Sequence, residues 1–182
     1  MENNVSMIVL AIVLVLLIVI LPVYNIFTRQ DDMSYNVALK AVTNFADKVR
    51  TTGRLTYDDY THLLSQLSAT NNSYEIELEG HRNYYFKSKN IVNYDEEFSL
   101  ETIVDYTDKI LEVLKGNYDK TSDSYSYDGI YTLDRGESFF IRVKNTNITK
   151  ADSLLSSIKL MDSESRVDID YGGVVLVNSI KK

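Results

Sequence analysis

The chain has no cysteine, no tryptophan, only 1 proline and only 7 glycines among its 182 residues. Without cysteine it can form no disulfide framework, no thiolate zinc site and no thiol nucleophile. Basic residues are also scarce, since 19 Lys and Arg stand against 26 Asp and Glu and leave a net charge of −7. Binding to a nucleic-acid backbone requires dense positive charge. We therefore expect no nucleic-acid partner.

The chain does have a long apolar run. Residues 7–27, MIVLAIVLVLLIVILPVYNIF, carry no charged side chain, and 13 of the 15 residues from Met7 to Leu21 are Leu, Ile or Val. The 20 residues from Val5 to Tyr24 would form about 30 Å of helix, which matches the hydrocarbon core of a bilayer. A cleaved signal peptide has a basic start and small residues before the cut, and both are missing here. We predict an uncut transmembrane anchor over residues 5–27, preceded by a short tail, residues 1–4.

The charges that flank this run give little guidance on its orientation. Arg29 and Lys40 follow it and taken alone would favour a cytoplasmic C-terminus under the positive-inside rule. The remainder of the chain is rich in Tyr, Asn and Ser and free of cysteine, as exported surface domains are. We expect a single-pass protein of the cell membrane, with a cytoplasmic N-terminus and an extracytoplasmic C-terminal domain.

The helical pattern continues beyond the apolar run. No Pro or Gly occurs between Pro22 and Gly53. Apolar residues recur there at three- and four-residue steps, which is typical of one buried helix face: Val37, Ala38, Ala41, Val42, Phe45 and Val49. We predict one helix from about Val5 to about Thr51, with residues 28–52 as the extension of the anchor.

Residues 53–182 are predicted to form an α+β domain, with an antiparallel sheet and short packing helices. Thr56 is expected to cap a helix whose buried face consists of Tyr60, Leu63, Leu64 and Leu67. The strict alternation in SYEIELEG, residues 73–80, predicts a strand with Tyr74, Ile76 and Leu78 inward. The sequence NYYFKSKNIV, residues 83–92, is a candidate second strand.

The second half of the domain is predicted to hold two helices and two hairpins. Residues 96–116 are expected to be helical, with an inward face made of Ile103, Val104, Ile110, Leu111 and Leu114. Residues 129–145 predict a hairpin that turns at Asp134-Arg135-Gly136, with Phe139, Ile141 and Val143 on its inner face. Thr149 and Asp152 resemble a capping box at the start of a short helix. A closing hairpin is expected to turn near Gly172-Gly173.

Candidate chemistry is sparse. His62 and His81 have no second His or Cys at ligand spacing, so ordinary surface or loop histidines are the better interpretation. A loop with Asp119, Asp123 and Asp128 could collect Ca²⁺, but its spacing is not that of a calcium-binding loop and a solvated loop is favoured. Asp95, Glu96 and Glu97 could form an acid–base pair or interact with a helix dipole, and we favour the second. We expect no catalytic residues, no cofactor, no metal and no small-molecule substrate.

Two surfaces are candidates for contact with partners. On the anchor we expect lipid and neighbouring helices to contact side chains from several faces: Val9, Ala11, Val13, Val15, Ile18, Ile20 and Pro22. One contact line could consist of Ala11, Val15 and Ile18. In the domain, four tyrosines could form a partner surface because Tyr combines large area with low entropy cost: Tyr118, Tyr125, Tyr127 and Tyr131. Packing along an edge strand explains them equally well.

The layout of the chain supports a family resemblance. The apolar span, FADKVRTTGRLTYDDYTHLLSQL and YEIELEG follow one another in an order that resembles pilin-like proteins of tight-adherence (Tad) systems in Gram-positive bacteria. The later stretches YTLDRGESFFIRVKN and YGGVVLVNS are similar to the ends of such proteins. The resemblance implies a minor pilin or pseudopilin of a type IV pilus-like system. It also implies a cytoplasmic secretion ATPase and a polytopic platform protein as co-workers, and no catalytic residues. The family's processing signal, a small residue before the cut and Glu five residues later, is absent.

Two functions are therefore expected from the sequence. The first is a non-enzymatic structural subunit of a pilus-like, secretion or conjugation apparatus, which contacts other pilin-like subunits and a platform protein through its anchor helix. The alternative is a bitopic surface protein whose extracellular domain senses a ligand or acts as an adhesin. A membrane-tethered enzyme ranks third because the residues for it are missing.

Overall fold

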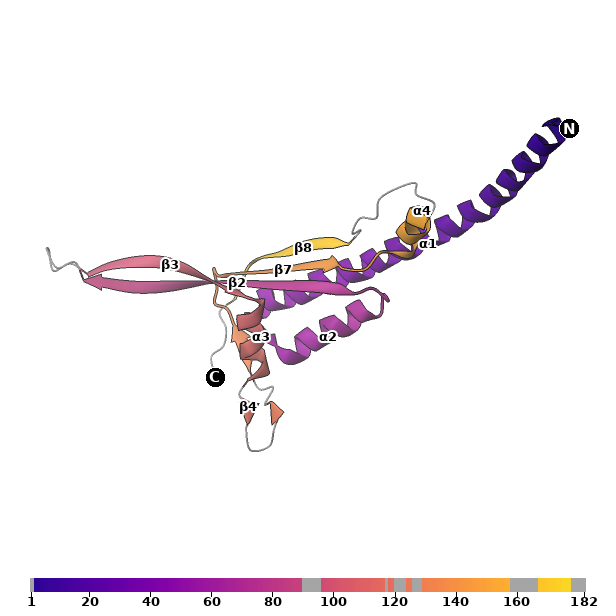
Figure 1. Cartoon of the computed structure of the whole chain (residues 1–182). Coiled ribbons are helices and arrows are strands. Elements are labelled where there is room, and N and C mark those ends of the chain that lie inside the picture. The colour runs from indigo at the N-terminus through magenta and orange to yellow at the C-terminus, as the bar shows by residue number, and fades with distance from the viewer. Residues whose placement is uncertain are drawn as a thin grey trace.

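The structure of the chain is a computed structural model that describes residues 2–89, 96–116, 118–119, 124–125, 129–157 and 167–177. One long helix, α1 (Glu2–Thr52), packs against an α+β domain with its C-terminal half and projects far beyond it with its N-terminal half (Figure 1). The uninterrupted helix that the sequence predicted is confirmed. At 1.5 Å per residue its 51 residues extend for about 75 Å.

The second half of α1 supplies one side of the hydrophobic core. Its buried stripe consists of Ala38, Ala41, Val42, Phe45, Ala46 and Val49. Val37, which the sequence placed in this stripe, is 46% exposed. The stripe is centred near Ala38, Val42, Phe45 and Val49, and at 100° per residue Val37 lies about 100° away from that centre.

A tight corner joins α1 to a second, antiparallel helix. Gly53 ends α1 with a φ of 64°, and its amide donates to the Val49 carbonyl at 2.7 Å. The short strand β1 (Arg54–Thr56) then leads into α2 (Tyr57–Ser68). Two residues of the predicted buried face, Leu63 and Leu67, are buried. Of the other two, Tyr60 is half-buried and Leu64 is exposed, so for Leu64 the prediction is wrong.

The central sheet has four antiparallel strands, in the order β3-β2-β7-β8. Their bounds are β2 (Tyr74–Lys89), β3 (Glu96–Tyr106), β7 (Ser138–Asn145) and β8 (Asp168–Val174). Alternate residues form the face that packs on the helices: Leu78, Phe139, Ile141, Val143 and Ile169. The Phe139 ring lies 6.0 Å from the Phe45 ring of α1. On the opposite face, β2 and β7 carry a group of charged side chains, Glu75, Glu77, Arg142 and Lys144, next to which Phe140 is half-buried.

The predicted helix over residues 96–116 is wrong over its first half. Residues Glu96–Tyr106 form β3, and only Thr107–Lys115 form the helix α3, in which Ile110 and Leu114 are buried. β3 pairs with β2 from Glu79↔Tyr106 to Lys89↔Glu96. Three consecutive β-branched residues, Thr102–Val104, favour a strand, and the cross-strand pairing overrides the helix-like spacing. As a consequence Ile103, which was expected to point inward, is exposed.

Beyond the four-stranded region, β2 and β3 continue together as a two-stranded ribbon. β7 pairs with β2 only as far as His81, whereas the β2–β3 pairing continues to Lys89 and Glu96. Figure 1 shows this ribbon projecting from the domain on the side away from the N-terminus. We call residues 82–89 and 96–103 the arm.

The predicted hairpin over residues 129–145 is also wrong, although its turn is in the expected place. The Glu137 amide donates to the Asp134 carbonyl at 3.1 Å, and Gly136 has a φ of 91°. The strands on either side join different sheets: β6 (Ile130–Thr132) pairs with β1, and β7 pairs with β2 and β8. The inward side chains of Phe139, Ile141 and Val143 are confirmed. A further small pair consists of β4 (Tyr118–Asp119) and β5 (Ser124–Tyr125).

Gly172 and Gly173 do not form a turn; both lie inside β8, so the predicted closing hairpin is wrong. A Cβ at Gly172 would overlap the Phe139 carbonyl oxygen, which explains glycine at this position by close approach of β7. The predicted start of a short helix at Thr149 is confirmed by α4 (Lys150–Ser157), for which Thr149 caps the Asp152 amide. The Asp152 amide donates to the Thr149 hydroxyl at 3.3 Å, and that hydroxyl donates to the Asp152 carboxylate at 3.0 Å.

Candidate functional site

The first half of α1 is an apolar cylinder with almost no protein around it. The large apolar side chains from Val5 to Leu21 are between 45% and 70% exposed, with the exception of the half-buried Ile20. Within the described residues α1 is the one helix long and apolar enough to cross a membrane, and the most apolar window has a mean hydropathy of 3.3 with none of it buried. Such a surface is stable only in contact with lipid or with other apolar helices.

The anchor residues that the sequence singled out lie on two opposite lines of this cylinder. Successive residues are about 100° apart, so Val9, Val13 and Ile20 fall on one line. Ala11, Val15 and Ile18 fall about 180° away from it, together with Pro22. All of them are exposed except Ile20. Two partners could therefore contact one copy of α1 at the same time.

Pro22 lies inside α1, which continues on both sides of it. The proline ring removes one N–H donor and crowds the carbonyl four residues earlier, that of Ile18. A long helix tolerates such a site in an apolar environment when the freed backbone groups find other partners. Pro22 therefore does not end α1.

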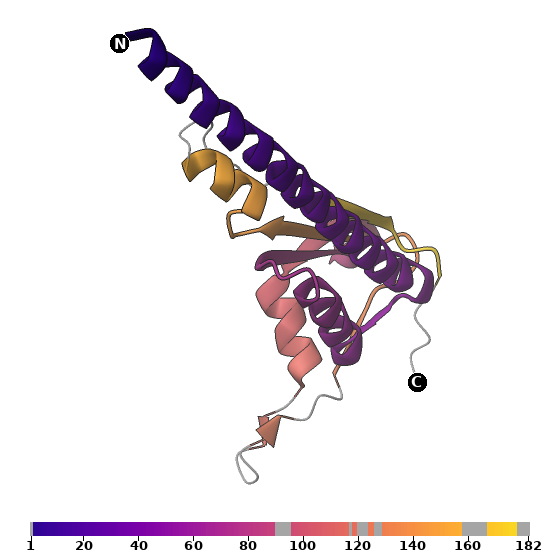
Figure 2. The same ribbon diagram turned by 90° about the vertical axis from the view of Figure 1, so that its right-hand side faces the viewer.

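The domain reaches back along α1 as far as this level. One stripe of the helix is half-buried: Ile20, Val23, Tyr24, Phe27 and Thr28. Further along the same side, Asp31 and Ser34 are buried. Figure 2 shows α4 alongside α1 in this region, and the two helices are in contact. The projecting half of α1 and the domain therefore meet without any intervening linker.

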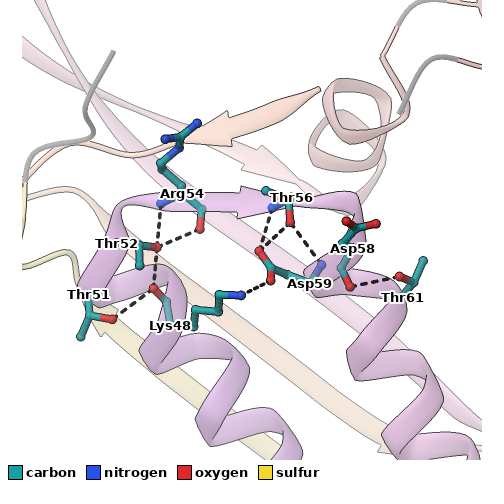
Figure 3. Close-up of polar contacts among 8 residues, drawn as sticks. All are labelled: Lys48, Thr51, Thr52, Arg54, Thr56, Asp58, Asp59 and Thr61. Carbon is teal, nitrogen blue, oxygen red and sulfur yellow. Dashed lines mark hydrogen bonds and ion pairs between the residues drawn. The ribbon is translucent and has the colours of Figure 1, made fainter. Parts of the chain in front are cut away.

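The corner between α1 and α2 is held by a compact polar network, drawn in Figure 3. The Thr56 hydroxyl accepts from the Asp59 amide at 3.2 Å, and the Asp59 carboxylate accepts from the Thr56 amide at 3.2 Å, which completes a capping box. Lys48 of α1 forms an ion pair with the same carboxylate. Burial raises the pKa of Asp59, but hydrogen bonds from Lys48 and Thr56 outweigh it and hold the pKa below its ordinary value. The network fixes the angle between the two helices.

Of the predicted tyrosine surface, the structure describes the side chain of Tyr131 and shows it to be buried. Tyr131 is 2% exposed, and its hydroxyl donates to Asp105 at 2.8 Å. For Tyr131 a partner surface is therefore wrong, and packing is the correct interpretation. Tyr118 and Tyr125 are paired across β4 and β5, and Tyr127 lies outside the described residues.

Sequence reasoning missed the tyrosines that are exposed on β2 and β3. Tyr85 is 75% exposed and pairs with Leu100 across the arm, while Tyr106 lies 62% exposed at the end of β3. No local signal identifies their exposure: Ile103 interrupts the alternation in residues 98–106, and Tyr85 is exposed because β7 ends before it. An exposed aromatic on a two-stranded ribbon is available for contact with another molecule.

A buried polar cluster lies where the arm leaves the sheet. Asp105 is 7% exposed and lies 2.6 Å from the Arg82 guanidinium (Oδ2 to Nη2). The Arg82 guanidinium also lies 5.5 Å from the centres of the Tyr84 and Tyr131 rings. Burial raises the pKa of Tyr131, and the hydrogen bond to Asp105 and the charge of that carboxylate raise it further. These groups are engaged with one another, and the cluster ties β2, β3 and β6 together.

The remaining sequence candidates do not converge on one place. His62 is exposed on α2, and His81 of β2 lies 3.4 Å from Glu79 and 5.3 Å from the Phe140 ring centre. Glu96 and Glu97 lie on β3, so the expected role at a helix start is wrong for them. Asp95, Asp123 and Asp128 are outside the described residues. Among the residues that the structure does describe, no group of three His, Asp or Glu side chains could hold a metal ion.

Comparison of the chain with known proteins returned no match among family models and no significant match among curated proteins or solved structures.

Proposed function

We propose that the protein is a non-enzymatic, membrane-anchored structural subunit, similar to a minor pilin or pseudopilin, of a pilus-like, secretion or conjugation apparatus. The observation that carries the proposal is α1: one unbroken helix whose first half is an exposed apolar cylinder and whose second half forms part of the domain core. A helix of this kind transmits force and position between a membrane and a domain, because no flexible linker separates the two halves.

Insertion of the exposed half into a bilayer is energetically favourable. On insertion scales each Leu, Ile or Val at a helix centre contributes about −0.3 to −0.6 kcal/mol, so the 13 such residues between Met7 and Leu21 contribute roughly −4 to −8 kcal/mol. No charged side chain within the span offsets this gain. In the proposed arrangement the N-terminus is cytoplasmic and the domain is extracytoplasmic, which protease shaving of intact cells would test.

The anchor is also the proposed assembly surface. Lipid tails are as apolar as leucine, so helices associate in a bilayer through close packing and not through the hydrophobic effect. The opposite lines through Val13 and Val15 allow one copy of α1 to contact another pilin-like subunit on one side and a platform protein on the other. This arrangement would place each subunit in a chain of contacts within the membrane.

Cysteine crosslinking tests the proposal, because the chain has no cysteine of its own. Single cysteines are introduced at Val9, Val13 and Ile20, and separately at Ala11, Val15 and Ile18. In native membranes at least one of the two lines is expected to form disulfide-linked dimers. Cysteine at Asn44, which is exposed on the domain half of α1, is the matched control and should not crosslink. Strictly monomeric protein at all six anchor positions would contradict the proposal.

A second candidate function is a bitopic surface protein with a ligand-sensing or adhesive domain. The observation that favours it is the arm, whose exposed Tyr85 and Leu100 form a cross-strand pair far from α1. On this hypothesis Tyr85→Ala abolishes binding of the protein to its target surface and leaves anchor crosslinking intact. A screen in which no ligand raises the melting temperature of the protein would leave this second function without support.

A further inference from the structure

A groove runs along α1 just after the apolar span. Its volume is about 500 Å³. One wall is a line on α1, and the other wall is the turn that follows α2. Its lining residues are Ile26, Arg29, Gln30, Met33, Ser34, Val37, Ala69, Thr70 and Asn71.

The apolar wall of the groove, on α1, remains exposed beside the turn that follows α2. Ile26, Met33 and Val37 are 62%, 68% and 46% exposed. At 100° per residue these three side chains fall within about 40° of one another, so they continue one face of the span beyond the membrane. The groove is therefore an apolar extension of the lipid-facing surface on the domain side.

The groove also contains one basic side chain, with the exposed Asp32 three residues farther along α1. Arg29 is the first basic side chain of the sequence, and the next one is Lys40. The Arg29 side chain is exposed. If the span ends near Tyr24, Arg29 lies about 7 Å above the hydrocarbon core, at the depth of the lipid phosphates. A guanidinium presents several N–H donors in a geometry that matches a phosphate.

The other wall offers side-chain donors but no free backbone donors. The amides of Ala69, Thr70 and Asn71 donate to the carbonyls of Ser65, Leu67 and Ser68. The Asn71 side chain is exposed, and Gln30 is half-buried beside it in the groove. A phosphate in the groove would therefore be bound mainly by Arg29, with neutral side chains around it.

We propose that this groove binds the headgroup of one phospholipid from the adjoining half of the bilayer, with Arg29 on the phosphate, Ile26 against its glycerol and upper chain carbons, and Met33 beside the outer end of the headgroup. The inference rests on the proposed membrane anchor. The groove joins an apolar wall, continuous with the span, to one cation at phosphate depth, and this combination matches a lipid better than a free anion or a soluble peptide. Bound lipid would fix the depth and rotation of α1 in the membrane.

Fluorescence quenching in lipid nanodiscs tests the proposal, because the full chain contains no tryptophan. Met33→Trp places one reporter in the groove. Tyr35→Trp is the control at nearly the same height, because Tyr35 lies about 3 Å farther along α1 and about 200° around it. With phosphatidylcholine that carries a nitroxide on its headgroup, Met33→Trp is expected to be quenched at a much lower fraction of labelled lipid than Tyr35→Trp.

Arg29→Gln in the Met33→Trp background tests the role of the cation. A hydrogen bond to a charged group changes affinity by roughly tenfold, so about ten times more labelled lipid should be needed for half-maximal quenching. Lys40→Gln is the matched control: it removes one exposed cation from nearly the same face, about 16 Å farther from the span, and should leave the quenching unchanged.

Val15→Trp separates failure of this inference from failure of the anchor, with a nitroxide on the lipid acyl chain as quencher. If Val15→Trp is quenched but Met33→Trp and Tyr35→Trp respond alike, the anchor stands and the lipid site is wrong. If Val15→Trp is not quenched, the anchor itself is wrong. Efficient crosslinking of Met33→Cys between two copies, with no quenching of Met33→Trp, would assign the groove to a second copy and overturn the lipid site.

Discussion

The guanidinium of Arg82 on β2 lies 2.6 Å from the carboxylate of Asp105 on β3, in the place where the arm leaves the four-stranded sheet. The same carboxylate oxygen accepts a hydrogen bond from the Tyr131 hydroxyl at 2.8 Å. One nearly buried charge thus joins three strands that belong to two different sheets. The base of the arm is held by this charge as well as by its backbone ladder.

Replacing Asp105 by Asn should destabilise the domain, because it leaves the Arg82 guanidinium without its counter-charge. We expect the free energy of unfolding to fall by about 2–3 kcal/mol, less than for a fully buried pair because Arg82 retains contact with water. Urea unfolding of the full chain in detergent micelles, followed by tyrosine fluorescence, measures the change. Lys109→Gln, which removes the exposed 2.9 Å pair with Glu112, should cost less than about 0.5 kcal/mol. Equal effects of the two variants would contradict the assigned role.

The protein should lose stability in alkaline solution through Tyr131. Burial and Asp105 raise the pKa of Tyr131 in the folded state, so above pH 10 the unfolded chain releases a proton that the folded chain retains. The contribution of Tyr131 to the free energy of unfolding is therefore fully present below about pH 10. Above that pH it declines by less than about 1.4 kcal/mol per pH unit. Tyr131→Phe should be less stable at pH 8 and should show a flatter decline between pH 9 and pH 11. Parallel curves for the two proteins would show that Tyr131 is not responsible.

Gly172→Ala should separate β8 from β7. A Cβ at Gly172 meets the carbonyl oxygen of Phe139 and the backbone of Phe140, which cannot move without opening the ladder. We expect a loss of about 3 kcal/mol. Gly80→Ala is the comparison, since its Cβ meets the hydroxyl end of the Tyr131 side chain, which can shift more easily, and the loss should be about 1–2 kcal/mol. If Gly80→Ala lowered the melting temperature more than Gly172→Ala did, the argument would be refuted.

Thr56→Ala should weaken the corner between α1 and α2 by about 1 kcal/mol, because it removes half of the capping box. Thr61→Ala is the control, since the Thr61 hydroxyl only donates to a carbonyl of its own helix, and should change stability by less than about 0.5 kcal/mol. The pKa of Asp59 is lowered in the folded state, so its contribution is present above its ordinary pKa and is lost as the pH falls below about 4. Thr56→Ala should therefore show a smaller loss of stability on acidification than the unmodified chain.

A distance measurement can test whether α1 is one continuous helix. Spin labels on cysteines introduced at Val15 and Asn44 are 29 residues apart, which corresponds to about 43 Å along a straight helix. We expect one narrow distance distribution in micelles and in nanodiscs. Insertion of two glycines after Asp32 should broaden it strongly. An equally broad distribution in the unmodified chain would show that the two halves of α1 move independently.

The sequence predicted those elements whose signal is local and repeated. α1 follows from an apolar run and a regular stripe without Pro or Gly, and its end follows from Gly53. The capping residues Thr56 and Thr149 mark helix starts because their side chains satisfy amides only a few residues away. The alternation from Tyr74 to Leu78 is a strand because one face lies on the core and the other in solvent.

The errors concern elements whose form is decided by distant partners. Residues 96–106 fit a helix by spacing, but in the folded domain all of them pair with β2, which is distant in the local pattern. Gly172 has the composition of a turn, but its lack of a side chain serves the close approach of β7. Asp134 and Gly136 do form a turn, yet nothing local indicates that the strands on either side belong to different sheets.

The candidate surfaces also differ in whether the sequence alone could predict them. The exposed anchor residues could be named from composition alone, because lipid-facing side chains need no partner in the chain. The burial of Tyr131 and the exposure of Tyr85 could not be predicted from the sequence. They depend on where Asp105 and the end of β7 lie in three dimensions.

The attachment of β8 to α1 affects the order in which the parts of the domain can fold. Tyr171 donates to Asp47, and Arg50 donates to the Val174 carbonyl, across 124 residues of chain in each case. Contacts of such separation form late in folding. A nascent chain that stops short of β8 would leave the inner side of α1 without its last covering strand. We therefore expect chaperones to bind the emerging polypeptide until almost all of it has been synthesised.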